Sequence, residues 1–214
     1  MRKHILIAAA ATLSLAAALL AADPATVTLP KPVTDGGKPL MQVLKERHTA
    51  REFKSDALPQ AALSNLLWAA WGISRADNDH RTAPSAMNQQ EIDIYVFTAE
   101  GVFLYDAKPH ALKPVLSGDH RAAAGKQDFV ATAPLSLVYV ADQSKMGKTS
   151  SDADKAFYAA ADCGFIAENV YLFCASEGLN CVVRGYVDRD AIAKTLNLHP
   201  EQKVLLGQTV GYPK

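Results

Sequence analysis

The chain has 214 residues, enough for one domain of ordinary size that buries most of its apolar surface on folding. Its 22 Lys and Arg residues balance 22 Asp and Glu residues, so the formal net charge is zero. This balance excludes a global positive field that would attract nucleic acid or an anionic membrane, and any anion site must be local.

The first 22 residues have the pattern of a secretory signal peptide. Arg2 and Lys3 precede a continuous run of apolar and small residues that ends at Ala21-Ala22. The alternative is an anchoring transmembrane helix, because Ile5 to Ala22 is about long enough to span a bilayer. The alanine-rich composition and the small residues at its end favour cleavage. We therefore expect a periplasmic or extracellular protein without stable membrane association after signal cleavage.

Two helices are predicted after an irregular N-terminal segment. Residues 23–38 are rich in Pro, Gly and Thr without sustained periodicity, which predicts an extended arm or linker before a folded domain of residues 39–214. Leu40, Val43 and Leu44 have helical spacing directly after Pro39. Residues 60–71 carry a second apolar stripe, and Gly72 ends it.

The central part of the sequence predicts strands. Ile92, Ile94 and Val96 alternate with a period of two, and residues 100–106 are the expected hairpin partner. A short helix is expected around residues 119–130. The nearly continuous apolar run 133–142 is typical of a central strand covered on both faces.

The last third begins with a long helix. Residues 154–178 are apolar around most of the helix circumference, which predicts burial at the centre of a domain or in a subunit interface, with an end at Gly178. A strand at 179–186, a helix at 188–198 and a strand at 203–213 follow. The predicted fold class is α+β, with a mostly antiparallel central sheet flanked by helices.

The three cysteines, Cys163, Cys174 and Cys181, show no CxxC spacing, so neither a zinc site nor a disulfide framework is indicated. Buried thiols are expected. Cys163 and Cys174 would lie about 16 Å apart along one helix, too far for a disulfide. A disulfide between Cys174 and Cys181 stays open.

The stretch KERHTAREF concentrates cationic side chains after the first predicted helix. One interpretation of Arg47 and His48 is that a helix C-terminus prefers cations, because its unpaired carbonyl groups carry partial negative charge. Arg51, four residues beyond Arg47, favours a second interpretation. Two guanidinium groups and the Thr49 hydroxyl together can surround a phosphate.

Two further polar stretches are candidates for binding. RTAPSAMNQQ brings Arg81, Ser85, Asn88, Gln89 and Gln90 together in a loop, and amide side chains suit the edge of a heterocycle with alternating donors and acceptors. The alternative is a solvated loop. In CVVRGYVD, a glycine at a strand end would let a flat ligand approach the backbone.

A metal hydrolase is a rival interpretation. It would use Asp77, Asp79 and His80 of DNDH, but this loop lacks an HExxH-like helical pattern and an obvious further ligand.

Five stretches in order, LKERHTAREF, LLWAAWGIS, PSAMNQQ, SEGLNCVVRGY and GQTVGYP, resemble the nitroreductase-like FMN-dependent oxidoreductases over residues 39–213. RTAPSA followed by GVFLYDAKPHAL is similar to the branch that includes azoline-oxidising dehydrogenases. The resemblance implies a nitroreductase-like fold, an intimate homodimer, and one noncovalently bound FMN in each of two sites at the interface.

The resemblance also implies the site residues. Arg47, His48, Thr49 and Arg51 would hold the FMN phosphate, ribityl chain and pyrimidine edge. Pro84, Ser85 and Asn88 would meet the ring from the other subunit. The backbone at Val183, Arg184 and Gly185 would face the flavin N5 atom, with the Arg184 side chain favouring an anionic substrate. Many relatives bring a later Lys or Arg to the phosphate; here either Lys214 would replace it or phosphate binding would be weaker.

The function implied by the resemblance is transfer of hydride or electrons through flavin N5 to or from a small substrate. Nitroaromatic, quinone and azoline-like compounds are the candidate substrates, and the electron donor is NAD(P)H or unknown. The alternative from another class is a non-catalytic, secreted, dimeric binding module that has the same fold and has lost flavin.

Overall fold

The computed structural model describes residues 25–147 and 151–214, and the expected signal peptide lies outside them. The helices are α1 (Leu40–Glu46), α2 (Gln60–Trp71), α3 (Asp152–Glu177) and α4 (Arg189–Thr195). The strands are β1 (Val27–Thr28), β2 (Ile73–Arg75), β3 (His80–Arg81), β4 (Ile92–Phe97), β5 (Gly101–Asp106), β6 (Ala111–Ser117), β7 (Leu135–Asp142), β8 (Asn180–Arg184) and β9 (Gln202–Gly211). Within this part of the chain, none of the helices has the length and apolar character that a membrane crossing requires.

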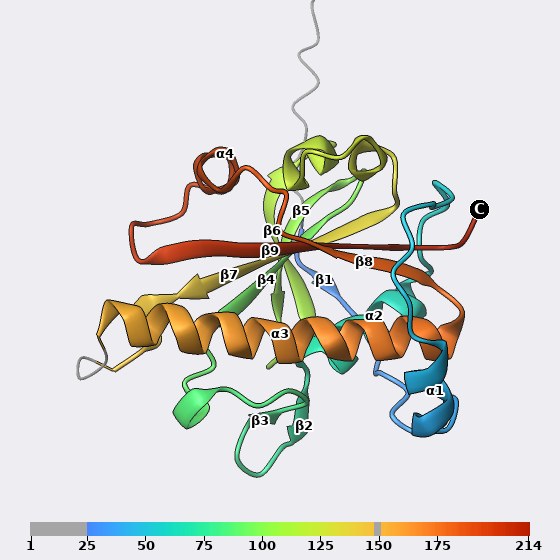
Figure 1. The fold of residues 1–214 in the computed structure, drawn as a ribbon, viewed down its shortest axis with the longest axis horizontal. Coiled ribbons are helices and arrows are strands. Elements are labelled where there is room, and N and C mark those ends of the chain that lie inside the picture. The colour runs from blue at the N-terminus through green and yellow to red at the C-terminus, as the bar shows by residue number, and fades with distance from the viewer. Residues whose placement is uncertain (1–24, 148–150) are drawn as a thin grey trace, which may run out of the picture.

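A seven-stranded sheet forms the centre of the fold, in the order β1-β6-β5-β4-β7-β9-β8. Every neighbouring pair in it is antiparallel. Helices α2 and α3 lie on one face, and α4 lies on the other with short 3₁₀ turns (Figure 1). The α+β fold class with an antiparallel sheet is therefore confirmed.

The strands divide their side chains between the two faces, as a period of two requires. In β4, Ile92, Ile94 and Val96 pack into the apolar cluster beneath α2 and α3. Tyr95 and Phe97 of the same strand pack into the second cluster, toward α4. Strand β7 is buried along both faces in the same way, which confirms the prediction of a doubly covered central strand.

Helix α3 has well-defined ends. Ser151 and Asp154 form a capping box at its start, and Gly178 ends it in the left-handed conformation at φ 70°. One face of α3 packs on the sheet, whereas Phe157, Tyr158 and Phe165 are exposed. Within this chain, the expected burial is therefore found only along the face of α3 that packs on the sheet.

Three segments differ from the sequence-based expectations. Val27–Thr28 of the expected arm pairs with β6, a strand whose apolar pattern is interrupted by Lys113 and Pro114. The loop after α2 contains the β2–β3 hairpin. The helix expected around 119–130 is instead two 3₁₀ turns, because Gly125 between them is extended at φ 170° and ψ 166°.

Candidate functional site

The cationic segment, residues 47–51, leaves the C-terminal end of α1 and runs beside the start of β8. The backbone N–H of Ala50 donates to the carbonyl of Cys181 at 3.0 Å. Further along, Asn180 Nδ2 donates to the carbonyl of Glu52 at 2.7 Å. These bonds fix the backbone while the side chains of Arg47, His48, Thr49 and Arg51 stay wholly or partly exposed.

Tyr171 of α3 organises this segment from below. Its hydroxyl accepts a hydrogen bond from the Val183 backbone N–H at 2.9 Å and lies 3.0 Å from the Thr49 hydroxyl. The Arg47 guanidinium carbon lies 5.2 Å from the centre of the Tyr171 ring, a cation–π distance. One aromatic side chain therefore ties the cationic segment, α3 and β8 together.

The cations of this segment lack anionic partners. Neither Arg47 nor Arg51 forms a salt bridge among the described residues, and the nearby carboxylate of Glu46 is paired with Lys38 at 2.7 Å. The Nδ1 atom of His48 lies 2.9 Å from the Glu46 carbonyl, which can only accept, so Nδ1 is the donor. The arrangement is suited to an external anion.

The amide loop, residues 84–90, is held by hydrogen bonds along its length. Ser85 Oγ accepts from the Gln90 backbone N–H at 3.0 Å, and Asn88 Oδ1 accepts from Gln90 Nε2 at 3.1 Å. The backbone N–H of Ala86 donates to Asp162 Oδ2 on α3 at 2.8 Å. Pro84 is exposed, and Ser85 is partly buried.

The loop also has a strained backbone. Met87, Asn88 and Gln90 adopt positive φ angles of 52°, 53° and 51°. Asn accepts this conformation readily, but it costs of order 1–2 kcal/mol for Met or Gln, and such strain is typical of functional sites.

The two clusters are separated within one chain. Tyr171 and Asp162, which anchor them, are nine residues apart on α3, or about 14 Å along the helix axis. The structure therefore does not bring Ser85 and Asn88 to the cationic segment of the same chain.

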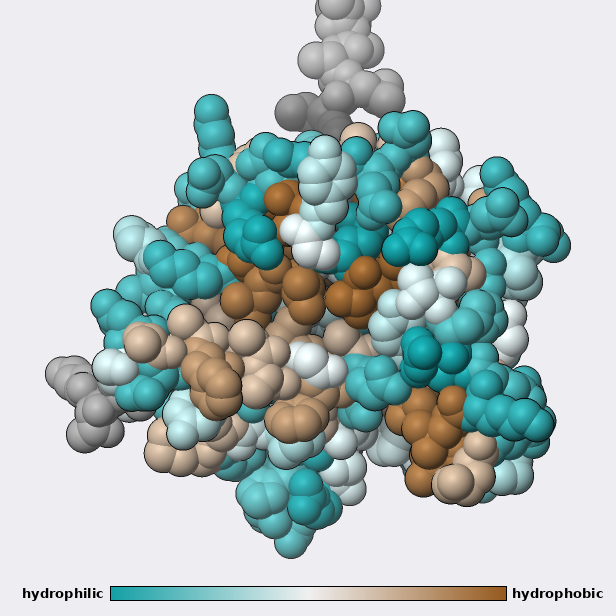
Figure 2. Space-filling view, in the orientation of Figure 1, coloured by the Kyte–Doolittle hydropathy of each residue, from teal (hydrophilic) through white to brown (hydrophobic). Residues whose placement is uncertain are grey.

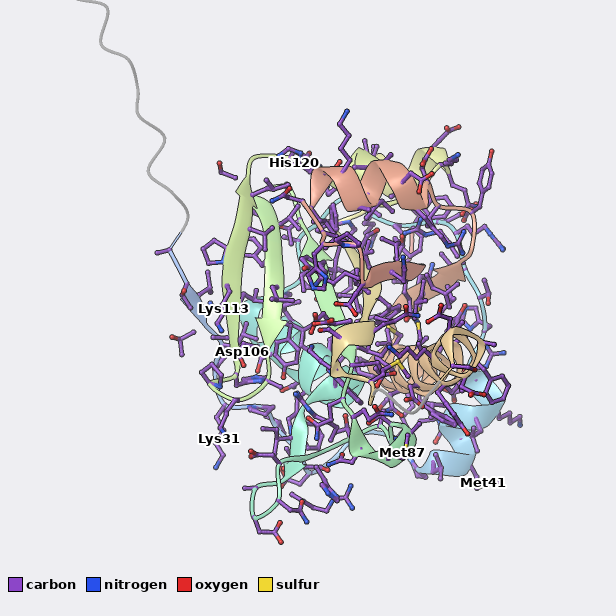
Figure 3. The ribbon with its side chains drawn as sticks, turned by 90° about the vertical axis from the view of Figure 1, so that its left-hand side faces the viewer. Lys31, Met41, Met87, Asp106, Lys113 and His120 are labelled. Atoms are coloured by element: carbon purple, nitrogen blue, oxygen red, sulfur yellow. The ribbon has the colours of Figure 1, made fainter. Side chains whose placement is uncertain are left out.

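An exposed apolar face lies between and around the clusters. Figure 2 shows apolar surface along α3 and again over α1. Met41 and Met87, exposed at 76% and 72%, lie at the same end of the molecule in Figure 3. The exposed apolar residues of this face are Leu40, Met41, Leu44, Met87, Phe157, Tyr158 and Phe165.

The side chain of Arg184 does not belong to the candidate site. It is 2% exposed and points away from α3, with Nη1 donating to the Ala124 carbonyl at 3.0 Å. The expectation that this side chain favours an anionic substrate is therefore wrong. Burial lowers the pKa of the guanidinium to about 10, so it remains charged at neutral pH. Only the backbone of Val183 to Gly185 remains a candidate.

The C-terminus lies near the cationic segment. The backbone N–H of Lys54 donates to the carbonyl of Tyr212 at 2.9 Å, so the chain end runs beside the stretch that directly follows this segment (Figure 1). Lys214, two residues later, is exposed.

The rival metal site finds no support in the described residues. No group of three or more His, Cys, Asp or Glu side chains within 25–147 and 151–214 is arranged to hold a metal ion. Asp79 forms a salt bridge with Lys108 at 3.2 Å. All three cysteines are buried, free thiols, and Cys181 Sγ accepts a hydrogen bond from Gln208.

Comparison with known proteins decides the family. The family model described as the nitroreductase family matches residues 44–212. The chain belongs to the nitroreductase family. A curated protein of Methanocaldococcus jannaschii that carries a nitroreductase name is 32% identical over 170 residues, covering 74% of this chain and 84% of the relative.

Solved structures agree with this membership. A Ralstonia eutropha structure with a nitroreductase name is 40% identical, with a TM-score of 0.85, and the match covers 90% of this chain and 91% of that one. A chain of the Escherichia coli microcin synthetase McbBCD complex shares the fold, with a TM-score of 0.67 at 18% identity, over 87% and 77% of the two chains.

Two groups that support the site carry no distinct signal in the sequence. Tyr171 lies within the apolar pattern of the long helix, and only its hydroxyl, which requires a partner when buried, indicates a further role. Glu91 and Asp162 are buried carboxyl residues that lie behind the amide loop, and neither stands in a recognisable sequence motif. Their proximity depends on the packing of α3 against β4.

Proposed function

We propose that this protein is an exported, FMN-dependent oxidoreductase that acts as a homodimer. Family membership supports an oxidoreductase, and the cofactor, dimer and export are the further steps of the proposal. Export rests on the sequence pattern of residues 1–22.

The observation that carries the proposal is the uncompensated charge of the cationic segment. Arg47 and Arg51 lack carboxylate partners among the described residues, and they lie four positions apart with His48 and Thr49 between them. Guanidinium groups bind phosphate oxygens with paired N–H donors. These residues therefore fit the phosphate of FMN, and Lys214 adds a further cation near the same segment.

Each group of side chains has a distinct task in this proposal. Arg47 and Arg51 hold the phosphate, and Thr49 and His48 offer hydrogen bonds to the ribityl chain and the pyrimidine edge. The backbone from Val183 to Gly185 borders the reactive edge of the ring, where a glycine leaves room for close approach. When bound, FMN supplies hydride chemistry at its N5 atom, and the protein sets the orientation of the ring.

The separation of the clusters supports the homodimer. Because the amide loop and the cationic segment lie far apart in one chain, a complete site requires Pro84, Ser85 and Asn88 from a second copy. The exposed apolar residues of α1, α3 and the amide loop are the surface that such a copy would cover.

Several classes of substrate are compatible with FMN as the cofactor. A small, flat oxidant or reductant would stack on the flavin, and nitroaromatic, quinone and azoline-like compounds meet this requirement. The azoline alternative is supported by the shared fold with a microcin synthetase chain. NAD(P)H, or another donor available outside the cytoplasm, would reduce the flavin.

The direct test is a visible absorption spectrum of the purified protein after incubation with excess FMN and desalting. Oxidised-flavin bands at about one per chain that bleach with dithionite support the proposal. A folded, dimeric and colourless protein would refute the FMN assignment and leave the binding module as the better explanation.

A further inference from the structure

A buried pair of carboxyl groups lies directly behind the amide loop. Glu91, the residue between the loop and β4, is fully buried, and Asp162 of α3 is 2% exposed. Asp162 Oδ2 accepts the hydrogen bond from the Ala86 backbone N–H at 2.8 Å. The pair therefore connects the start of the loop, through α3, to the residue at its end.

Glu91 has no donor among the described residues. Both of its carboxyl oxygens are buried without a hydrogen-bond partner. The neighbouring group is the Asp162 carboxyl, whose charge and side chain raise the pKa of Glu91, and because carboxylates only accept, a bond between the two requires a proton on one of them. Two ionised carboxylates at this position would repel each other in a poorly solvated environment.

The surroundings favour the protonated form of Glu91. Burial, followed by the negative charge of Asp162, raises the pKa of Glu91 to about 7. The Cys163 thiol contributes no charge, because burial raises its pKa to about 12. Lys145 opposes the shift but is paired with Asp93 at 2.8 Å. The titratable or charged groups around Glu91 are Asp162 and Cys163 from α3, Asp142 at the end of β7, and Lys145 after β7.

We propose that Glu91 carries a proton that it donates to Asp162, and that this shared proton positions the amide loop for the flavin ring bound by a second copy of the chain. The end of the loop is held by Arg81 Nε, which donates to Gln90 Oε1 at 2.8 Å, whereas its start is tied to α3 by the bond from Ala86 to Asp162. Loss of the proton leaves two buried negative charges, which separate and release the Ala86 N–H. Glu91 and Asp162 are thus positioning residues, and this inference rests on the proposed flavin function.

The consequence is a pH-dependent flavin site. Between about pH 6 and about pH 8.5, the affinity of the wild-type protein for FMN should fall about threefold to tenfold as Glu91 ionises. Other groups, including the FMN phosphate, also titrate in this range. The informative quantity is therefore the difference between the wild type and Glu91→Gln, whose amide cannot ionise and still donates to Asp162.

The first experiment measures FMN dissociation constants across this pH range by flavin fluorescence. Glu91→Gln should keep the low-pH affinity of the wild type throughout. The exposed carboxylate of Glu100 provides a matched control, and Glu100→Gln should follow the wild-type profile. Equal pH profiles for the wild type and Glu91→Gln would overturn the proposal.

The second experiment does not require flavin. Amide hydrogen exchange of the purified apoprotein should show that the protection factor of the Ala86 N–H falls as pH rises through about 7 in the wild type, but not in Glu91→Gln. If neither the wild type nor the variants bind FMN, but the pH dependence of Ala86 protection still differs between the wild type and Glu91→Gln, the proposed function is refuted and the shared proton is supported. A pH-independent protection factor in the wild type would overturn the shared proton itself.

A further variant covers the case in which Glu91→Gln does not fold. Asp162→Asn removes the repelling charge but keeps an oxygen that accepts from Ala86. It should move the midpoint of the Ala86 protection change to lower pH. An unchanged midpoint would overturn the coupling between the two carboxyl groups.

Discussion

Gly125 makes room for a buried guanidinium group, and this contact yields the sharpest prediction about stability. A Cβ atom at Gly125 would lie 1.8 Å from Arg184 Nη1 and 3.0 Å from its Cζ. Gly125→Ala must therefore displace the guanidinium from the Ala124 carbonyl, to which it donates at 3.0 Å. The backbone of Gly125 itself is extended, so the cost comes from this collision alone.

The magnitude follows from the bond that is lost. A hydrogen bond to a charged group contributes about 1.5–3 kcal/mol, and a displaced, buried cation adds to the cost. We expect Gly125→Ala to lower the free energy of unfolding by about 2–4 kcal/mol, and the melting temperature by about 5–15 °C. In an Arg184→Met background, where no guanidinium is present, the same substitution should cost less than about 1 kcal/mol.

Urea unfolding of the apoprotein, followed by circular dichroism at one fixed protein concentration, gives the four free energies of this cycle. Gly185→Ala is the matched control, because its Cβ would meet only Leu206 Cδ2, at 3.9 Å. It should change the free energy of unfolding by no more than about 0.5 kcal/mol. If Gly125→Ala costs the same with and without Arg184, the collision is not the cause.

Three further predictions concern the site. Arg47→Ala should weaken FMN binding by about tenfold to a hundredfold with an unchanged circular dichroism spectrum. The control variant Arg75→Ala should bind FMN as the wild type does. Equal FMN affinities of Arg47→Ala and the wild type would exclude a phosphate contact. Tyr171→Phe leaves the Val183 N–H without its acceptor and should lower the free energy of unfolding by about 1–2 kcal/mol in thermal melts, and no change would show that water replaces the hydroxyl. Because the pKa of Glu91 is raised from 4.5 to about 7 in the folded state, its contribution to stability is complete below about pH 4.5 and is lost as pH rises through about 7. Glu91→Gln should remove this part of the pH dependence in urea titrations, and an unchanged slope would contradict the raised pKa.

The local sequence determined most of the secondary structure. The two-residue period of Ile92, Ile94 and Val96 and the continuous apolar run of β7 were sufficient, because burial on one or both faces of a sheet requires these patterns. Gly178 marked the end of α3, since few other residues adopt the left-handed conformation there. The order of the motifs also led to the correct family.

The tertiary structure decided the contacts that depend on distant segments. The direction of the Arg184 side chain was not evident from CVVRGYVD, because the room for it is made by Gly125 and Gly207 from other parts of the chain. In the same way, β6 was recognisable only by its pairing with β1 and β5, since Lys113 and Pro114 interrupt its apolar alternation.

The candidate site shows the same division. The sequence identified Arg47, Thr49 and Arg51 because a concentration of cations is visible locally. Only the fold placed Tyr171 beneath them and brought Glu91 to Asp162, seventy-one positions away in the chain. Residue types report the chemistry that is available, whereas the packing of α3 on the sheet decides which groups meet, how well they are solvated and which of them can hold a proton.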